Sequence, residues 1–167
     1  MATRTAATAV AGDFSDRVLK GATDFAGPTD FLVAPTALMP VETVIAARTL
    51  TAADSGKTFI LSLAGGFNVT LPAPARGLFF RFFCGIAPTT AYTITTNGTT
   101  QNVMHGTTLN GENSVATNGS ATSGTGVDVL TFVANKAQIG DFAELCSDGT
   151  SWFAIVGITQ QDAATLA

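Results

Sequence analysis

The sequence contains little charge. Asp, Glu, Lys and Arg make up 12% of its 167 residues, about half the share of an average globular protein. The eight Lys and Arg residues are scattered and the net charge is −4, so we expect no nucleic-acid partner, which would need a basic patch. Solubility depends on Thr, Ser, Asn and backbone groups, or part of the surface is covered in an assembly.

Long apolar runs are also missing. A membrane-spanning helix needs about 20 consecutive apolar residues, and no segment approaches this length. Residues 1–11 are rich in Thr and Ala, which make a poor apolar segment for a secretion signal. We therefore expect no membrane partner and synthesis in the cytoplasm. Apolar residues still make up 46% of the chain. This share is enough to form the core of a buried domain, and it argues against a chain that is disordered throughout.

Reactive side chains are few. His105 is the only histidine, and the residues around it form no recognisable nucleophile–histidine pair or metal-ligand cluster. Asp128, Asp141, Glu144 and Asp148 could bring two carboxylates together, as glycoside hydrolysis requires. We interpret Asp148 as a turn residue, and Glu144 as paired or as part of an interface. We expect no catalytic, metal or cofactor-binding residues, and a protein that is not an enzyme.

Cysteine is almost absent. Cys84 and Cys146 each lie within an apolar run. A disulfide would form if these runs were suitably placed neighbouring strands, but buried free thiols are more common in a protein made in the cytosol. We expect free thiols.

From Thr49 onward, short apolar or alternating runs are separated by Gly, Pro, Asn-Gly and Asp-Gly steps, a pattern typical of strands and turns. The predicted strands cover residues 57–63, 67–71, 77–85, 91–96, 101–105, 107–117, 127–134, 138–146 and 151–158. Eight or nine short antiparallel strands favour an all-β fold: a β-sandwich, a jelly-roll-like domain or a small barrel. We assign residues 49–158 to this β domain and 159–167 to a C-terminal tail.

Two strand features are informative. The last two predicted strands flank residues 147–150, whose Asp-Gly step is a strong hairpin signal, and the second of them holds the only tryptophan, Trp152. In the run 78–83, aromatic side chains fall on both faces, because successive side chains of a strand point to opposite sides. We expect this strand to be covered on both sides. The residues assigned to the core or to a subunit interface are Phe79, Phe80, Phe82, Phe83 and Trp152.

Residues 1–48 have a different pattern, with prolines at 28, 35 and 40 and three phenylalanines that each follow an aspartate. A short helix is predicted over residues 15–20, and the rest is extended. A flexible tail and an arm that orders on a partner both fit this pattern. We favour an extended N-terminal arm, with Phe14, Phe25 and Phe31 as its anchors to a partner.

Three segments carry a family resemblance. They are residues 50–59 (Leu-Thr-Ala-Ala-Asp-Ser-Gly-Lys-Thr-Phe), 66–75 (Gly-Phe-Asn-Val-Thr-Leu-Pro-Ala-Pro-Ala) and 147–153 (Ser-Asp-Gly-Thr-Ser-Trp-Phe), with the Phe-rich strand between the last two. In these segments the chain resembles the capsid decoration, or cement, proteins of tailed bacteriophages and similar β modules on phage tail fibres. The likeness covers residues 49–158 and does not extend to the arm.

The resemblance implies a structural protein of the virion, an all-β homotrimer on the outer capsid surface. Its partners would be the major capsid protein and neighbouring decoration subunits, and it would stabilise the capsid by bridging major capsid subunits. An alternative is a tail-fibre or receptor-binding module, although the sequence contains no long repetitive shaft. A carbohydrate-active enzyme or lectin is a third hypothesis, weakened because Trp152 and Tyr92 are the only Trp and Tyr residues.

Overall fold

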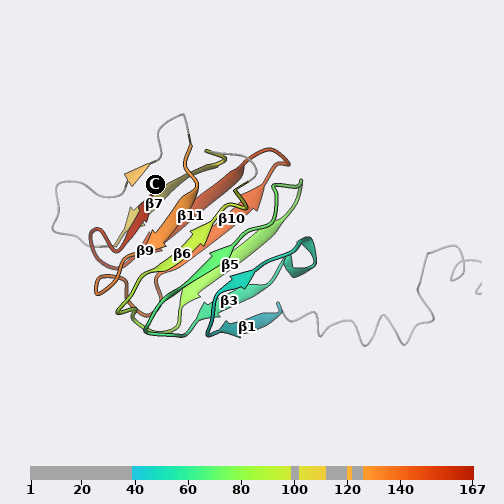
Figure 1. Cartoon of the computed structure of the whole chain (residues 1–167). Coiled ribbons are helices and arrows are strands. Elements are labelled where there is room, and N and C mark those ends of the chain that lie inside the picture. The colour runs from blue at the N-terminus through green and yellow to red at the C-terminus, as the bar shows by residue number, and fades with distance from the viewer. Residues whose placement is uncertain (1–38, 99–101, 112–119, 122–125) are drawn as a thin grey trace, which may run out of the picture. The chain divides into compact units, whose positions relative to one another are not determined.

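The computed structural model describes residues 39–98, 102–111, 120–121 and 126–167, which form two mixed β-sheets (Figure 1). Sheet A has seven strands in the order β1-β3-β5-β10-β11-β7-β8, and sheet B has five in the order β12-β9-β6-β4-β2. The strands are β1 (Val41–Val44), β2 (Arg48–Thr49), β3 (Thr58–Leu61), β4 (Phe67–Thr70), β5 (Phe79–Cys84), β6 (Tyr92–Thr95), β7 (Met104–Asn110), β8 (Ser120–Ala121), β9 (Val129–Phe132), β10 (Phe142–Ser147), β11 (Trp152–Ile158) and β12 (Ala164–Leu166). A short 3₁₀ helix, η2 (Ala52–Asp54), lies between β2 and β3.

The first six strands alternate between the sheets: β1, β3 and β5 belong to sheet A, and β2, β4 and β6 belong to sheet B. Within each sheet these strands pair in parallel. The parallel direction follows from the winding, because a chain that crosses to the other sheet and returns enters the first sheet in its original direction. Equivalent side chains then stack from one turn of the chain to the next, with Phe59 beside Phe82 and Val69 beside Ile94.

The second half of the chain closes sheet A with the predicted hairpin. Strands β10 and β11 pair antiparallel up to Ser147 and Trp152. In the turn, the Asp148 carboxylate accepts hydrogen bonds from the N–H groups of Thr150 and Ser151, each at 2.8 Å. Gly149 has a φ of 107°, a left-handed conformation that glycine adopts without steric cost. The hairpin prediction is confirmed.

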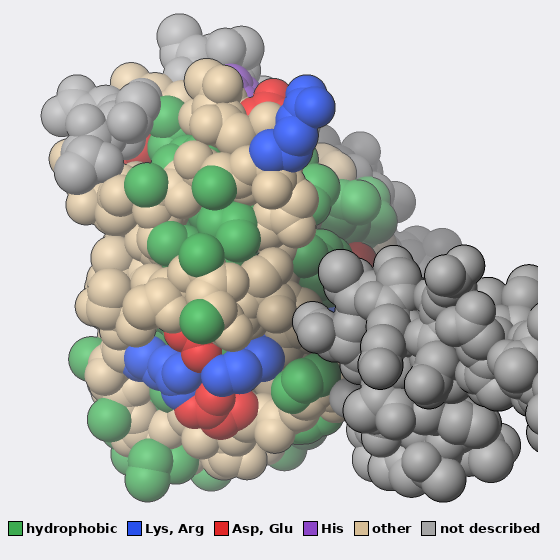
Figure 2. All heavy atoms as spheres, turned by 90° about the vertical axis from the view of Figure 1, so that its right-hand side faces the viewer, with side chains coloured by type: hydrophobic (Ala, Val, Ile, Leu, Met, Phe, Trp, Pro, Cys, Tyr) green, Lys and Arg blue, Asp and Glu red, His purple; other side chains and the backbone are tan. Residues whose placement is uncertain are grey.

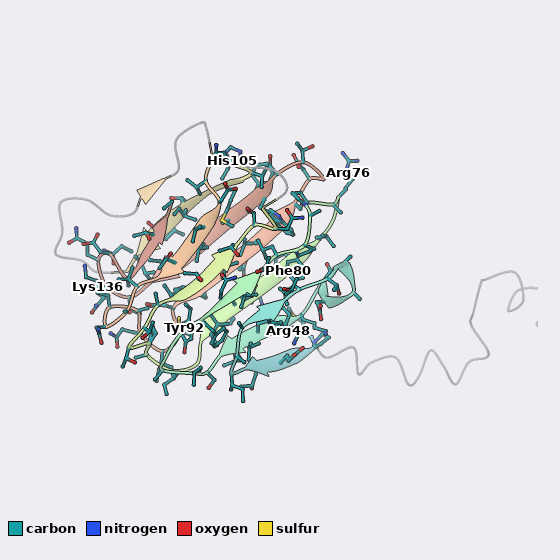
Figure 3. All side chains as sticks on the ribbon, in the orientation of Figure 1. Arg48, Arg76, Phe80, Tyr92, His105 and Lys136 are labelled. Atoms are coloured by element: carbon teal, nitrogen blue, oxygen red, sulfur yellow. The ribbon has the colours of Figure 1, made fainter. Side chains whose placement is uncertain are left out.

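One hydrophobic core lies between the sheets. Its members include Phe59, Leu61, Phe80, Phe82, Met104, Leu145, Trp152 and Val156 from sheet A, and Val69, Tyr92, Ile94, Leu130 and Phe132 from sheet B. In Figure 3, Phe80 and Tyr92 lie within the domain, whereas Arg76 and Lys136 lie at opposite ends of it. The Tyr92 hydroxyl donates to the carbonyl of Leu61 at 3.3 Å and accepts from the N–H of Leu63 at 3.2 Å. This buried side chain of sheet B therefore bonds to backbone at the end of β3 in sheet A.

The all-β prediction is confirmed, but the prediction of antiparallel strands is wrong for half of the pairings. Five of the ten pairings are parallel. Each strand pattern was interpreted locally, and local alternation gives the two faces of a strand without giving its partner or direction. The partner follows from the winding of the chain between the sheets, which is a non-local property.

The strand boundaries also differ from the prediction. The described part of the expected strands 101–105 and 107–117 contains one strand, β7, and residues 112–117 lie outside the described residues. Strand β1 and the first residue of β2 fall in the segment assigned to the arm, and β12 falls in the expected tail. These three are short outer strands, and two to four residues are too few to show an alternating pattern. The helix expected over residues 15–20 lies outside the described residues.

Gly66 is required where the chain leaves sheet A and enters β4. Its φ is 64°, and a Cβ atom there would lie 2.1 Å from the carbonyl oxygen of Thr90 and 2.3 Å from that of Ala91. Backbone atoms cannot move aside as a flexible side chain can, so a substitution must displace the start of β6. Gly77 also has a positive φ, 84°, but a Cβ atom there would meet nothing within 4 Å.

We expect Gly66→Ala to lower the free energy of unfolding by at least about 3 kcal/mol, because steric overlap adds to left-handed strain. Gly77→Ala serves as the control and should lose only about 1 kcal/mol, from backbone strain alone. Urea denaturation of both variants measures the difference. Equal losses in the two variants would show that the contact at Gly66 has no importance.

Candidate interaction surface

The two sheets present different outer faces. The outward side chains of sheet B are mainly threonine: Asn68, Thr93, Thr131 and Thr165 form one row across the strands, and Thr49, Thr70, Thr95 and Val129 form the next. They also bond to one another. The Thr93 hydroxyl donates to the Asn68 side-chain oxygen at 2.8 Å, and the Asn68 amide donates to the Thr70 hydroxyl at 2.9 Å. This face suits contact with water.

The outer face of sheet A is apolar. Its outward side chains form three rows across the strands: Phe79, Cys146, Phe153 and His105; Thr58, Arg81, Glu144, Ile155 and Thr107; and Ile60, Phe83, Phe142, Gly157 and Leu109. Phe153 is 45% exposed, Ile155 50% and Leu109 56%. The described part of the chain thus leaves large apolar side chains in contact with water on several adjacent strands, which is typical of an interaction surface.

A single ion pair lies in the middle of this face. Nη2 of Arg81 is 2.6 Å from Oε1 of Glu144, across the pair β5–β10. The guanidinium also lies 5.7 Å from the centre of the Phe79 ring. Nε of Arg81 is buried and has no hydrogen-bond partner among the described residues. The sequence interpretation of Glu144 as a paired residue is confirmed. The three rows contain one guanidinium group and one carboxylate, and these two groups neutralise each other.

Beside the ion pair, the face contains a groove of about 270 Å³ between β5, β7, β10 and β11. Apolar atoms of Phe79, Phe153 and Ile155 form much of its wall, and His105 and Cys146 lie along its sides. The rings of His105 and Phe153 are 6.1 Å apart. The volume is below the range of most small-molecule sites, and it is suited to a single large side chain.

The structure divides the residues assigned to the core or interface into two sets. Phe80, Phe82 and Trp152 are fully buried in the core. Phe79 and Phe83 point to the outer face of sheet A and are half-buried. Sequence reasoning did not find Phe153 and Ile155. The signal was present, because both alternate with the buried residues of β11. The arm anchors Phe14, Phe25 and Phe31 lie outside the described residues.

The cysteines are free, as predicted, and they lie on opposite faces of sheet A. Cys84 points into the core, and burial followed by the negative charge of Asp141 raises the pKa of its thiol to about 12. It is therefore a poor nucleophile. Cys146 is exposed on the outer face, so the expectation that both thiols are buried is wrong for it. Along β10, Cys146 lies between the buried residues Leu145 and Ser147. Because successive side chains of a strand point to opposite faces, its thiol points to the outer face of sheet A.

Asp141 and Asp128 bind backbone groups. The buried carboxylate of Asp141 accepts from the N–H groups of Gln138 and Thr159, both at 2.8 Å. Asp128 accepts from the Thr96 hydroxyl and from the N–H of Asn102. Both acids hold loops in place. Among the described residues, no group of three His, Cys, Asp or Glu side chains could hold a metal ion, and no helix is long and apolar enough to span a bilayer.

A second charged feature lies at the end of the domain that Figure 2 faces, where Lys and Arg side chains lie beside Asp and Glu. Asp54 is its centre: Oδ1 accepts from Arg48 at 2.9 Å and from Lys57 at 2.6 Å, and Oδ2 accepts from the N–H and hydroxyl of Thr51. Glu42 pairs with Arg48 and Lys57. The hydrogen bond from Lys57 is the main cause that lowers the pKa of Asp54 from 3.8 to about 2. Every charge in this cluster has a partner, so it stabilises the η2 segment.

The chain matches no family model, no curated protein and no solved structure. Its function must therefore be inferred from the geometry above and from the resemblance described for residues 49–158.

The lowered pKa of Asp54 predicts a specific loss of stability in acid. Because the folded pKa lies below the unfolded one, the carboxylate stabilises the fold above about pH 4, and this contribution is lost as the pH falls toward 2. We expect Asp54→Asn to cost on the order of 1–2 kcal/mol at pH 7 and to lose less stability than wild type between pH 4 and pH 2.

Asp162→Asn is the matched control, because Asp162 forms an exposed ion pair with Lys136 at 3.3 Å and such pairs contribute little. Denaturant titrations at several pH values give both comparisons. The assignment is wrong if Asp54→Asn and wild type have parallel stability curves in acid.

Proposed function

We propose that this protein is a bacteriophage capsid decoration, or cement, protein: a homotrimer on the outer capsid surface that stabilises the shell by bridging major capsid subunits. In this proposal the two sheets form a β-sandwich, and the apolar outer face of sheet A is the surface that becomes buried on assembly. That face is the observation on which the proposal depends. The resemblance to cement proteins supports the choice of partner.

Burial of this face would stabilise an assembly substantially. Transfer of one large apolar side chain from water into a contact contributes about 1.5–3 kcal/mol. Phe153, Ile155 and Leu109 are each about half exposed, so each would contribute part of that amount. The Arg81–Glu144 pair is already formed within one chain and would enter a contact with its charges neutralised. An apolar centre with little net charge is typical of the core of a protein interface.

A trimer explains how such a surface could act as cement. A cyclic oligomer matches a local three-fold axis of a shell, so each copy meets an equivalent capsid surface. Three linked copies bind with avidity, and each single contact can then be weak. The Thr-rich face of sheet B is suited to remain in water, as a surface protein requires. The mechanism is mechanical bridging and needs no catalytic group, cofactor or metal.

We expect Phe153→Asp to convert the trimer to monomers at a concentration at which wild type is trimeric. Phe153 is exposed, and the residues directly opposite it are Cys146 and His105. The acid on this face, Glu144, lies in the next row and is paired with Arg81. Desolvation of the new carboxylate on assembly would cost several kcal/mol. Analytical ultracentrifugation measures the mass, and circular dichroism and thermal unfolding report whether the fold is kept.

The control is Thr165→Asp, which adds the same charge to an exposed position on the outer face of sheet B. This variant should remain trimeric. If wild type is a monomer at every concentration tested, or if both variants remain trimeric, the proposed role of the sheet A face is overturned.

Binding to the shell tests the functional part of the proposal. Purified protein should co-sediment with capsids of the virus that encodes it and raise the temperature at which they break open, whereas Phe153→Asp should do neither at the same concentration. Labelling of virions with an antibody to the chain then separates head from tail: many labels over the head are expected. Label confined to the tail would replace the cement proposal with the tail-fibre alternative.

A further inference from the structure

We propose that the groove between β5, β7, β10 and β11 of one copy receives a phenylalanine from the N-terminal arm of a neighbouring copy, as part of an Asp-Phe step. The inference rests on the proposed function, because it requires copies that assemble, and it names the occupant of one part of their contact surface. The arm residues concerned are Phe14, Phe25 and Phe31, preceded by Asp13, Asp24 and Asp30.

The groove has the shape and chemistry for one aromatic side chain. Its volume is about 270 Å³, and Phe79, Phe153 and Ile155 provide apolar wall on β5 and β11. The rings of Phe79 and Phe153 offer edges and faces for a third ring, an arrangement that contributes beyond the burial of area. Gly106, which pairs with the buried Ala154, lines the groove with backbone and has no side chain to narrow it.

The charges around the groove suit an Asp-Phe step better than an isolated phenylalanine. The ionisable groups that face it or adjoin it are His105, Glu144, Cys146 and Arg81. Arg81 holds Glu144 at 2.6 Å and lies over Phe79, so the carboxylate of Glu144 is compensated. A carboxylate placed beside the ring of an inserted phenylalanine would then meet the Arg81 guanidinium or the imidazole of His105. Both groups can donate a hydrogen bond to it.

The length of the arm makes contact with another copy feasible. The described domain begins at Met39, beside β1, the first edge of the same sheet. The preceding 38 residues span up to about 133 Å when extended. Phe31 is eight residues from Met39, and this short tether reaches up to about 28 Å. An arm fixed to one subunit would be present at a high effective concentration near the grooves of its neighbours.

Site-specific photo-crosslinking in the full chain tests the inference. One version carries benzoylphenylalanine at position 14, 25 or 31 and has no tag. A second version carries a C-terminal affinity tag and no crosslinker. The two are co-expressed, irradiated and purified through the tag under denaturing conditions, so that every recovered adduct joins two different chains. Mass spectrometry of the digested adducts locates the acceptor residues.

We expect adducts from at least one of the three positions on peptides of β7, β10 or β11 that line the groove. The crosslinker at Leu32, next to Phe31, is the matched control, because in an extended arm it points to the opposite side, and it should give at least fivefold less adduct at the groove. Cys146→Trp in the tagged chain fills the groove and keeps its face apolar. It should reduce these adducts at least fivefold.

Native mass spectrometry of the same samples keeps the two proposals separate. Mixed trimers that give no adduct at the groove, or adducts that Cys146→Trp leaves unchanged, overturn the inference and leave the proposed function standing. The fraction that the tag does not retain is digested as well, and groove adducts found only there, within the untagged chain, overturn the inference too, since the arm would then bind its own domain. If no mixed oligomers form at all, the trimer proposal fails, and the inference fails with it.

Discussion

The structure depends on the alternation of side chains across the strands of sheet A. Phe80 and Phe82 of β5 fill the core, so Phe79 and Phe83 must lie on the outer face. A shift of β5 by one residue would bring Arg81 into the core and expose the buried phenylalanines, which the core does not permit. The register chosen by the core therefore also determines which side chains face outward. The same constraint places Phe153 and Ile155 outside on β11.

A feature could be predicted from the sequence when the residues that determine it are close together in the chain, and could not when they are far apart. The turn at Asp148 and Gly149 was predictable because its determinants are consecutive residues. In β6, Tyr92 and Ile94 alternate with threonines, a period-two signal carried by neighbouring residues, and the structure buries both side chains. The pairing of β3 with β5 was not predictable, because it depends on the excursion of the chain through β4 in sheet B. The apolar and polar pattern within a single strand does not show that the chain crosses to the other sheet and returns.

The outer face was accessible to sequence reasoning only in part. The four phenylalanines of residues 78–83 indicated an apolar strand on both sides, and the structure divides them accordingly. The remainder of the face comes from β3, β7, β10 and β11, and the pairings β3–β5, β5–β10 and β7–β11 join strands that are not consecutive in the chain. The position of Phe153 between Cys146 and His105 follows from sheet order alone. A groove made by four strands could not be derived before that order was known.

The residues that carry the family resemblance have structural roles. Asp54 holds η2 through Arg48, Lys57 and Thr51, Gly66 permits the close passage beside Thr90, and Asp148 forms the hairpin turn. These residues would be needed wherever this fold is used, whatever its partner. The outer face of sheet A shares Phe153, Thr58 and the outward residues of the Phe-rich strand with the segments that carry the resemblance, whereas its residues on β7 and β10, and Ile155 on β11, lie outside them. The resemblance and the apolar face are therefore only partly independent arguments for the proposed function.

The contrast between the two outer faces links the fold to the proposed function. Threonine rows on sheet B keep hydrogen-bonding groups at the surface, and a chain with 12% charged residues needs such rows to remain soluble. On the face of sheet A, the polar side chains in the three rows are His105, two threonines and one internally neutralised ion pair, set among apolar residues. A protein with one hydrated and one apolar face gains free energy by covering the apolar face alone. In the proposed assembly, this contrast would orient the protein on its partner without a strong single contact, and repetition around a symmetric shell would supply the strength.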